Sequence, residues 1–135
     1  MKTNLFFFIS NFNYGGASNA IFNFLNNLDQ KKYNLYVIFL GHSDYEKSLP
    51  KNIKYYRIKN YFYFFKTFFA FFKIKNILSQ KKFSETKNLF ISNIHYSNVL
   101  SVIFLRNIKN LKIVLFERTS LKELDIFKNF FSYFK

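Results

Sequence analysis

Along the chain, short uninterrupted apolar runs alternate with longer segments in which apolar residues recur every three or four positions. An uninterrupted run such as residues 5–9 is typical of a strand that is buried on both faces. Residues 17–28 follow it with apolar positions at i, i+3, i+4, i+7, i+8 and i+11, which predicts an amphipathic helix. By the same criteria, further strands are predicted at residues 36–40, 53–58, 89–91 and 111–116, and further helices at residues 61–80, at 96–105 and from Ser120 onward.

The alternation of strands and helices determines the predicted fold class. It favours an α/β fold with a Rossmann-like, doubly wound and mainly parallel sheet. The length of 135 residues fits a single domain. The last predicted helix begins with a capping box, Ser120 with Glu123, and its apolar residues Phe131 and Phe134 still need cover. We therefore expect more protein, or a partner, to follow this helix.

The chain carries a large excess of positive charge. The chain has 21 Lys and Arg against 7 Asp and Glu, a net charge of +14, and residues 47–84 contain ten basic and no acidic residues. Such a field favours anions, for example phosphates or acidic lipid head groups. The absence of cysteine excludes disulfides, thiol catalysis and cysteine metal sites. With no evident secretory signal or membrane span, the expected location is the cytoplasm, with or without peripheral attachment to the inner membrane face.

A glycine turn follows the first predicted strand. The sequence Tyr14-Gly15-Gly16-Ala17-Ser18 lies between that strand and the helix. In an open parallel sheet, ligands bind outside the carboxyl ends of the strands, and the N–H groups at a helix start suit phosphate. The turn is neither a G-x-G-x-x-G fingerprint nor a P-loop. Two interpretations stay open: a phosphate site, or a tight turn that needs glycine for its backbone angles.

Two later strands also end in polar residues. Glu117 and Arg118 follow the strand at 111–116, where an arginine can clamp a phosphate or carboxylate; the alternative is an exposed ion pair beside a helix cap. His95 follows the strand at 89–91, where it could donate to a sugar hydroxyl or transfer a proton; the alternative is a helix-start histidine with no task. His42 lies in a loop without evident partners, so the two histidines do not predict a metal site.

The segment 61–72 holds nine aromatic residues and one charge. It can place aromatic side chains in a membrane interface while lysines reach anionic head groups. Stacking on nucleic acid is the weaker interpretation because no nucleic-acid motif is present. A core-facing helix with solvated lysines is the third. The side chains expected to contact a membrane or a partner are Lys66, Phe68, Phe69, Phe72 and Lys73.

Together these features resemble the N-terminal domain of family 4 glycosyltransferases, which have the GT-B fold. The resemblance rests on the first strand, the Gly15-Gly16 turn and its helix, and on the Glu117-Arg118 pair after the fifth strand. It implies that Gly15, Gly16 and Ala17 lie against the diphosphate of a nucleotide-sugar donor. It also implies that His95 and the Glu117-Arg118 pair line the cleft where acceptor and sugar meet.

The resemblance further implies a reaction and its partners. A sugar would pass, with retention and without a metal or other cofactor, to a glycan or lipid-linked acceptor hydroxyl in surface polysaccharide or glycolipid synthesis. Residues 1–135 would form the acceptor-side domain only, because the family's donor-binding domain with its paired glutamates is absent. The chain is therefore expected to be inactive without that domain or a split partner subunit. The alternative is a noncatalytic basic and aromatic module that binds a membrane surface or a partner subunit. A nucleic-acid binder and a nicotinamide-dependent enzyme rank below these two.

Overall fold

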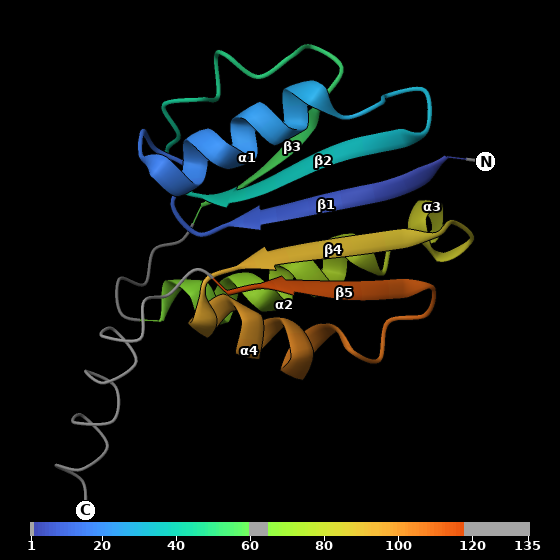
Figure 1. The fold of residues 1–135 in the computed structure, drawn as a ribbon. Coiled ribbons are helices and arrows are strands. Elements are labelled where there is room, and N and C mark those ends of the chain that lie inside the picture. Colours follow the sequence, from blue (N-terminus) through green and yellow to red (C-terminus); the bar gives the residue numbers. More distant parts are fainter. Residues whose placement is uncertain (1, 60–64, 118–135) are drawn as a thin grey trace, which may run out of the picture.

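The computed structural model describes residues 2–59 and 65–117, which fold into one small α/β domain with a five-stranded sheet (Figure 1). The elements in chain order are β1 (Thr3–Ile9), α1 (Gly16–Asn27), β2 (Tyr33–Leu40), β3 (Lys54–Ile58), α2 (Lys66–Leu78), α3 (Lys81–Ser84), β4 (Asn88–Asn93), α4 (His95–Leu105) and β5 (Leu111–Phe116). The predicted helix from Ser120 onward, Arg118 and most of the aromatic stretch before Phe65 lie outside the described residues.

All four strand pairs are parallel, and the strand order is β3-β2-β1-β4-β5. The chain builds outward from β1 to β3, then crosses back and adds β4 and β5 on the other side of β1. The direction of winding thus reverses between β1 and β4. This arrangement confirms the predicted Rossmann-like, doubly wound sheet.

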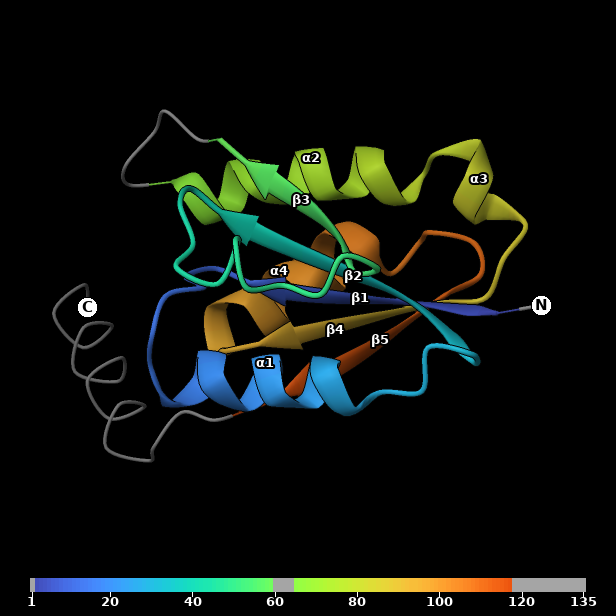
Figure 2. The same ribbon diagram turned by 90° about the horizontal axis from the view of Figure 1, so that it is seen from above.

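The sheet separates two hydrophobic cores. Successive side chains of a strand point to opposite faces, so Phe6 and Phe8 of β1 pack on the side of α2 and α4, whereas Phe7 packs on the side of α1. Figure 2 shows α1 and α2 on opposite sides of the sheet. Since β1 is buried on both faces, its sequence has to be an uninterrupted apolar run, which is the pattern that predicted it.

Three strands are longer than the apolar runs that predicted them, because asparagines near their amino ends hydrogen-bond to one another. Asn4 of β1 and Asn88 of β4 are both buried, and the Asn4 amide donates to the Asn88 side-chain oxygen at 2.9 Å. Asn34 of β2 donates to Asn4 at 2.9 Å. Polar residues usually mark the end of a strand, but here they satisfy one another across the sheet. The short helix α3 was not predicted at all.

None of the helices in the described ranges, 2–59 and 65–117, is both long enough and apolar enough to cross a bilayer.

Candidate functional site

The strongest candidate site lies where the winding of the sheet reverses. Helices α1 and α4 follow β1 and β4, the two neighbouring strands on either side of the reversal. Both helices begin at the edge of the sheet to which the strand arrows point (Figure 1). Neither helix has a side-chain cap or an acidic residue in its first turn. Two helix N-termini, each carrying partial positive charge, therefore flank the position at which such sheets bind ligands.

The glycine turn is open rather than strained. Gly15 has extended backbone angles, with φ 166° and ψ 163°, and Gly16 is the first residue of α1. A Cβ atom on Gly16 would have no described atom within 4 Å, and on Gly15 its nearest neighbour would be the Asn13 carbonyl oxygen at 4.0 Å. Backbone angles therefore do not require glycine here, contrary to the tight-turn interpretation. The missing side chains instead leave the first turn of α1, which includes Ala17, open to an approaching group.

The start of α4 is strained. Ile94, the residue between β4 and α4, has φ 79° and ψ 137°, a conformation that β-branched residues rarely adopt and that costs on the order of 1–3 kcal/mol. Its N–H donates to the Phe116 carbonyl at 3.3 Å, so the end of β5 holds it in place. Such strain occurs most often at functional sites. His95 follows as the first residue of α4, at the sheet edge where the sequence predicted it; its side chain is not described.

Asparagines join α4 to the ends of the strands. The buried Asn98 donates to the Phe116 carbonyl at 3.0 Å and approaches a carboxylate oxygen of Glu117 at 3.5 Å. Glu117 is thereby placed beside the first turns of α4, on the same side of the site as His95. Asn93 donates across the reversal to the Phe8 carbonyl at 3.5 Å. The sequence analysis missed both asparagines, and periodicity could not have found Asn98. The apolar residues Tyr96, Val99 and Ile103 share the other side of α4, which the structure leaves exposed, whereas Asn98 lies on the buried side.

An apolar pocket of about 150 Å³ lies beside this site, between α1 and the ends of β4 and β5. Its lining residues are Phe7, Ala20, Ile21, Phe24, Ile91, Asn93 and Phe116. The pocket is small for a ligand of its own, since typical ligand pockets have volumes of roughly 300–1,000 Å³. In residues 2–59 and 65–117, no group of three or more His, Cys, Asp or Glu side chains is arranged to hold a metal ion.

A larger groove, of about 640 Å³, lies at the carboxyl ends of β2 and β3. It is lined by Tyr14, His42, Ser43, Asp44, Glu46, Lys47, Tyr55 and Arg57. The sequence analysis found no partners for His42; the structure places it in the same groove as two carboxylates. The hydrogen bond to Glu46 raises the pKa of Tyr55, and the Glu46 charge acts in the same direction.

The predicted membrane or partner residues divide between the core and the surface. Helix α2 buries one side, which includes Phe71, and exposes Phe69 and Phe72 by 42% and 48%. Phe68 is half-buried, and its ring packs edge-on against Phe104 of α4 at 5.2 Å. Lys66 and Lys73 are exposed. One side of α2 therefore faces the core, and its other side exposes aromatic rings and lysines; contact of that side with a membrane or a partner stays a prediction.

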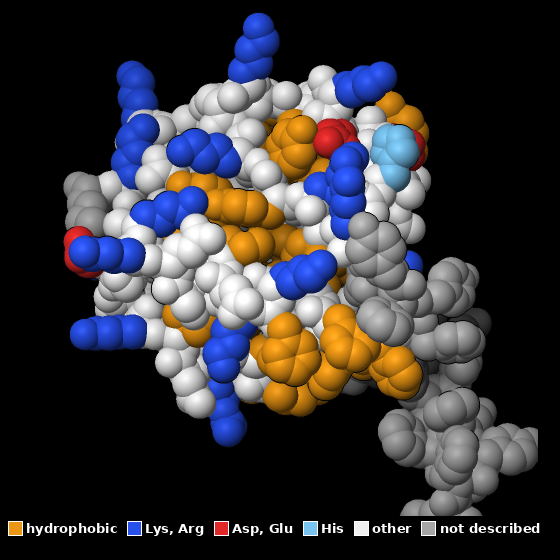
Figure 3. All heavy atoms as spheres, turned by 180° about the vertical axis from the view of Figure 1, so that it is seen from behind, with side chains coloured by type: hydrophobic (Ala, Val, Ile, Leu, Met, Phe, Trp, Pro, Cys, Tyr) orange, Lys and Arg blue, Asp and Glu red, His pale blue; other side chains and the backbone are white. Residues whose placement is uncertain are grey.

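Helix α4 extends the apolar surface of α2. Ile103 is 60% exposed, and Phe104 packs against Phe72 with ring centroids 4.7 Å apart. We call the exposed Phe65, Phe69, Phe72 and Ile103, together with Phe68 and Phe104, the aromatic face. Figure 3 shows hydrophobic side chains gathered on this side of the molecule, with Lys and Arg around them.

Comparison with known proteins adds no identification: the chain matches no protein-family model and no curated protein.

Proposed function

We propose that this domain is the acceptor-side half of a retaining glycosyltransferase that uses a nucleotide-sugar donor. The observation that carries the proposal is the open glycine turn at the reversal of the sheet, at the start of α1 and beside the start of α4. A leaving nucleoside diphosphate gains negative charge as its bond to the sugar breaks. Free N–H groups and helix dipoles directed at that charge stabilise the transition state.

We also propose roles for the remaining site residues. The backbone amides of Gly15, Gly16 and Ala17 contact the diphosphate. His95, Glu117 and Arg118 contact the transferred sugar or the acceptor hydroxyl. The hydroxyl oxygen forms the new bond to the sugar carbon as the bond from that carbon to the diphosphate breaks, and the hydroxyl proton passes to the leaving diphosphate. A second domain or a partner subunit holds most of the nucleotide, so the 135-residue chain alone is expected to transfer sugar poorly. The acceptor is a glycan or a lipid-linked sugar.

Substitution Gly16→Ala tests the turn. Because a methyl group at this position meets no protein atom, we expect the variant to fold with unchanged or slightly higher stability. The methyl group occupies space that a diphosphate would use, so the dissociation constant for UDP-glucose should rise about fivefold, a loss of about 1 kcal/mol. The measurement is a titration followed by the amide NMR shifts of residues 15–17, with inorganic pyrophosphate as competitor.

The matched control is Asn26→Ala, an exposed change at the other end of α1. It should leave the UDP-glucose titration unchanged. If neither UDP-glucose nor pyrophosphate at millimolar concentration shifts an amide of the turn, or if both bind equally to the wild-type chain and Gly16→Ala, the proposed role of the turn is wrong.

A second candidate function, attachment to an anionic membrane surface, is favoured by the aromatic face. Exposed rings beside lysines can insert between head groups while the lysines pair with lipid phosphates. Within the described residues, neither α2 nor α4 contains an acidic side chain that would oppose this. The two functions are compatible, because the aromatic face lies on the α2 and α4 side of the sheet and the glycine turn leads into α1 on the other.

The double variant Phe69→Ser/Phe72→Ser should reduce binding to vesicles at least tenfold, because two apolar rings no longer leave water on binding. The assay is co-sedimentation with vesicles of phosphatidylcholine containing 30% phosphatidylglycerol, compared with phosphatidylcholine alone. Phe24→Ser, which removes a 52% exposed ring from α1, is the matched control and should bind as the wild type does. If Phe24→Ser loses as much vesicle binding as the double variant, or if the wild type binds neutral vesicles as well as anionic ones, the aromatic face is not a site for anionic membranes.

A further inference from the structure

The groove at the ends of β2 and β3 is built on a fixed loop. Tyr45 anchors the loop that follows β2: its buried ring packs against Phe12 at 4.9 Å and Phe22 at 4.8 Å, and its hydroxyl donates to the Asn19 side chain. The buried Ser43 hydroxyl donates to the Phe12 carbonyl. The loop is therefore tied to α1 and to the segment after β1, and the groove wall is in place before any ligand arrives.

The groove differs in charge from the rest of the molecule. The described part of the chain contains five acidic residues against seventeen basic ones. Two of the five acids, Asp44 and Glu46, line the groove, balanced by Lys47 and Arg57. A site for a phosphate or another anion would not gather the scarce carboxylates of a basic protein, because like charges repel. A groove lined by four charged side chains is also unsuited to an apolar ligand, whose binding would strip them of water.

The individual side chains have the chemistry that recognises hydroxyl groups. Glu46 is paired with the Arg57 guanidinium at 3.3 Å, which fixes the carboxylate in place. One oxygen of Asp44 accepts from the Tyr14 N–H at 3.1 Å, while its other oxygen, Oδ1, has no partner in the described part of the chain and can accept from a hydroxyl. A carboxylate accepts hydrogen bonds from hydroxyl groups, and a guanidinium group donates hydrogen bonds to hydroxyl groups. The Glu46–Arg57 pair can therefore accept from one hydroxyl of a ligand and donate to a neighbouring one.

Two tyrosine rings supply the apolar part of the recognition. Tyr14 is 72% exposed and Tyr55 is 44% exposed, and both line the groove. An aromatic ring packs well against the C–H face of a sugar ring, whose hydroxyls point outward at its rim. The volume of about 640 Å³ lies within the range of small-molecule sites and has room for one or two sugar rings.

We infer that this groove binds a neutral saccharide, with Tyr14 and Tyr55 against the sugar face and Asp44, Glu46 and Arg57 on its hydroxyls. Tyr14 is the residue directly before Gly15, so the bound saccharide lies next to the glycine turn. It is therefore the acceptor. That last assignment rests on the proposed function, whereas saccharide binding by the groove does not.

The test is saturation-transfer difference NMR on the 135-residue chain with maltose, cellobiose and diacetylchitobiose, each at millimolar concentration. At least one of them should receive saturation. Tyr55→Ala and Glu46→Gln should each lower that signal at least threefold, while Tyr96→Ala, which removes a similarly exposed ring outside the groove, should leave it unchanged. The circular dichroism of every variant is compared with that of the wild type to confirm folding, and Glu46→Gln preserves side-chain size.

Absence of saturation transfer to all three disaccharides would overturn the inference. So would an equal signal from wild type, Tyr55→Ala and Glu46→Gln, or stronger transfer to glucose 6-phosphate than to the neutral sugars. None of these outcomes involves a nucleotide. If the chain binds disaccharides in the groove but neither UDP-glucose nor pyrophosphate shifts the amides of the turn, this inference stands and the proposed function is rejected. If the turn shifts but no disaccharide binds, the proposed function stands and this inference is rejected.

Discussion

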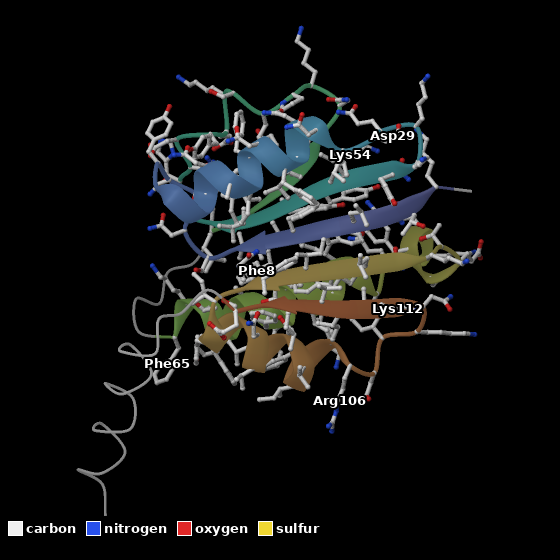
Figure 4. The ribbon with its side chains drawn as sticks, viewed as in Figure 1. Phe8, Asp29, Lys54, Phe65, Arg106 and Lys112 are labelled. Carbon is white, nitrogen blue, oxygen red and sulfur yellow. The ribbon has the colours of Figure 1, made fainter. Side chains whose placement is uncertain are left out.

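Replacing Phe8 by alanine is expected to lower the free energy of unfolding by about 3–5 kcal/mol, the usual cost of removing a fully buried aromatic ring. Phe8 has no exposed surface, and Figure 4 places it near the end of the central strand β1. Its ring packs edge-on against Phe71 of α2 at 5.1 Å and lies 6.3 Å from Phe90 of β4. The truncation therefore opens a cavity where strand, neighbouring strand and helix meet.

Urea denaturation followed by circular dichroism measures this loss. A small domain has only about 5–15 kcal/mol of stability in total, so Phe8→Ala should be partly unfolded at physiological temperature. Phe24→Ala is the control, because that ring on α1 is about half exposed and its removal should cost no more than about 1.5 kcal/mol. Similar losses for the two variants would contradict the described packing of the core.

Replacing Asn88 by leucine is expected to cost about 2–4 kcal/mol, although leucine is apolar and similar in size. The buried Asn88 amide donates to the Phe83 carbonyl at 2.7 Å and the Thr86 carbonyl at 3.0 Å, and its oxygen accepts from Asn4. Leucine removes these hydrogen bonds, together with the one that the Asn88 oxygen accepts from the Thr86 hydroxyl at 3.1 Å, and leaves their buried partners less satisfied. Each loss of this kind costs roughly 1 kcal/mol or more.

The control for this variant is Asn52→Leu, in the exposed loop before β3, which should change stability by less than about 0.5 kcal/mol. Both variants are compared with the wild type by urea denaturation. The asparagine network lies at the amino ends of the strands, away from the glycine turn at the carboxyl edge. Folded Asn88→Leu should therefore retain any UDP-glucose binding. A stability loss below about 1 kcal/mol would show that the network contributes little.

The candidate site could be predicted in outline but not in detail. The glycine turn follows a strand and precedes a helix, and local sequence pattern predicts both elements. Its position at the carboxyl edge of the sheet could therefore be predicted. Placement of Glu117 near the start of α4 also follows from parallel strands ending at one edge. The reason for the glycines was left open by the sequence, and the structure answers it, because neither backbone angles nor close neighbours require them. The strain at Ile94 has no sequence signal at all.

The saccharide groove was missed for a physical reason. Tyr14 and Asp44 are thirty residues apart, and their hydrogen bond exists only because β1 and β2 are paired and the loop after β2 folds back over the turn. His42 was judged by its neighbours in sequence, which say nothing about neighbours across a sheet. The scarcity of acidic residues was visible in the composition, but their meeting in one groove was not.

Local sequence patterns predicted the five strands, the helices α1, α2 and α4, and the fold class, but not the short helix α3. Burial on both faces requires uninterrupted apolar strands, and the alternation of strands with helices leads to a parallel sheet. Tertiary structure alone decided which polar residues are satisfied internally, as Asn4 and Asn88 are, and which side of α2 remains exposed. These outcomes depend on contacts between residues far apart in the chain, which no local pattern encodes.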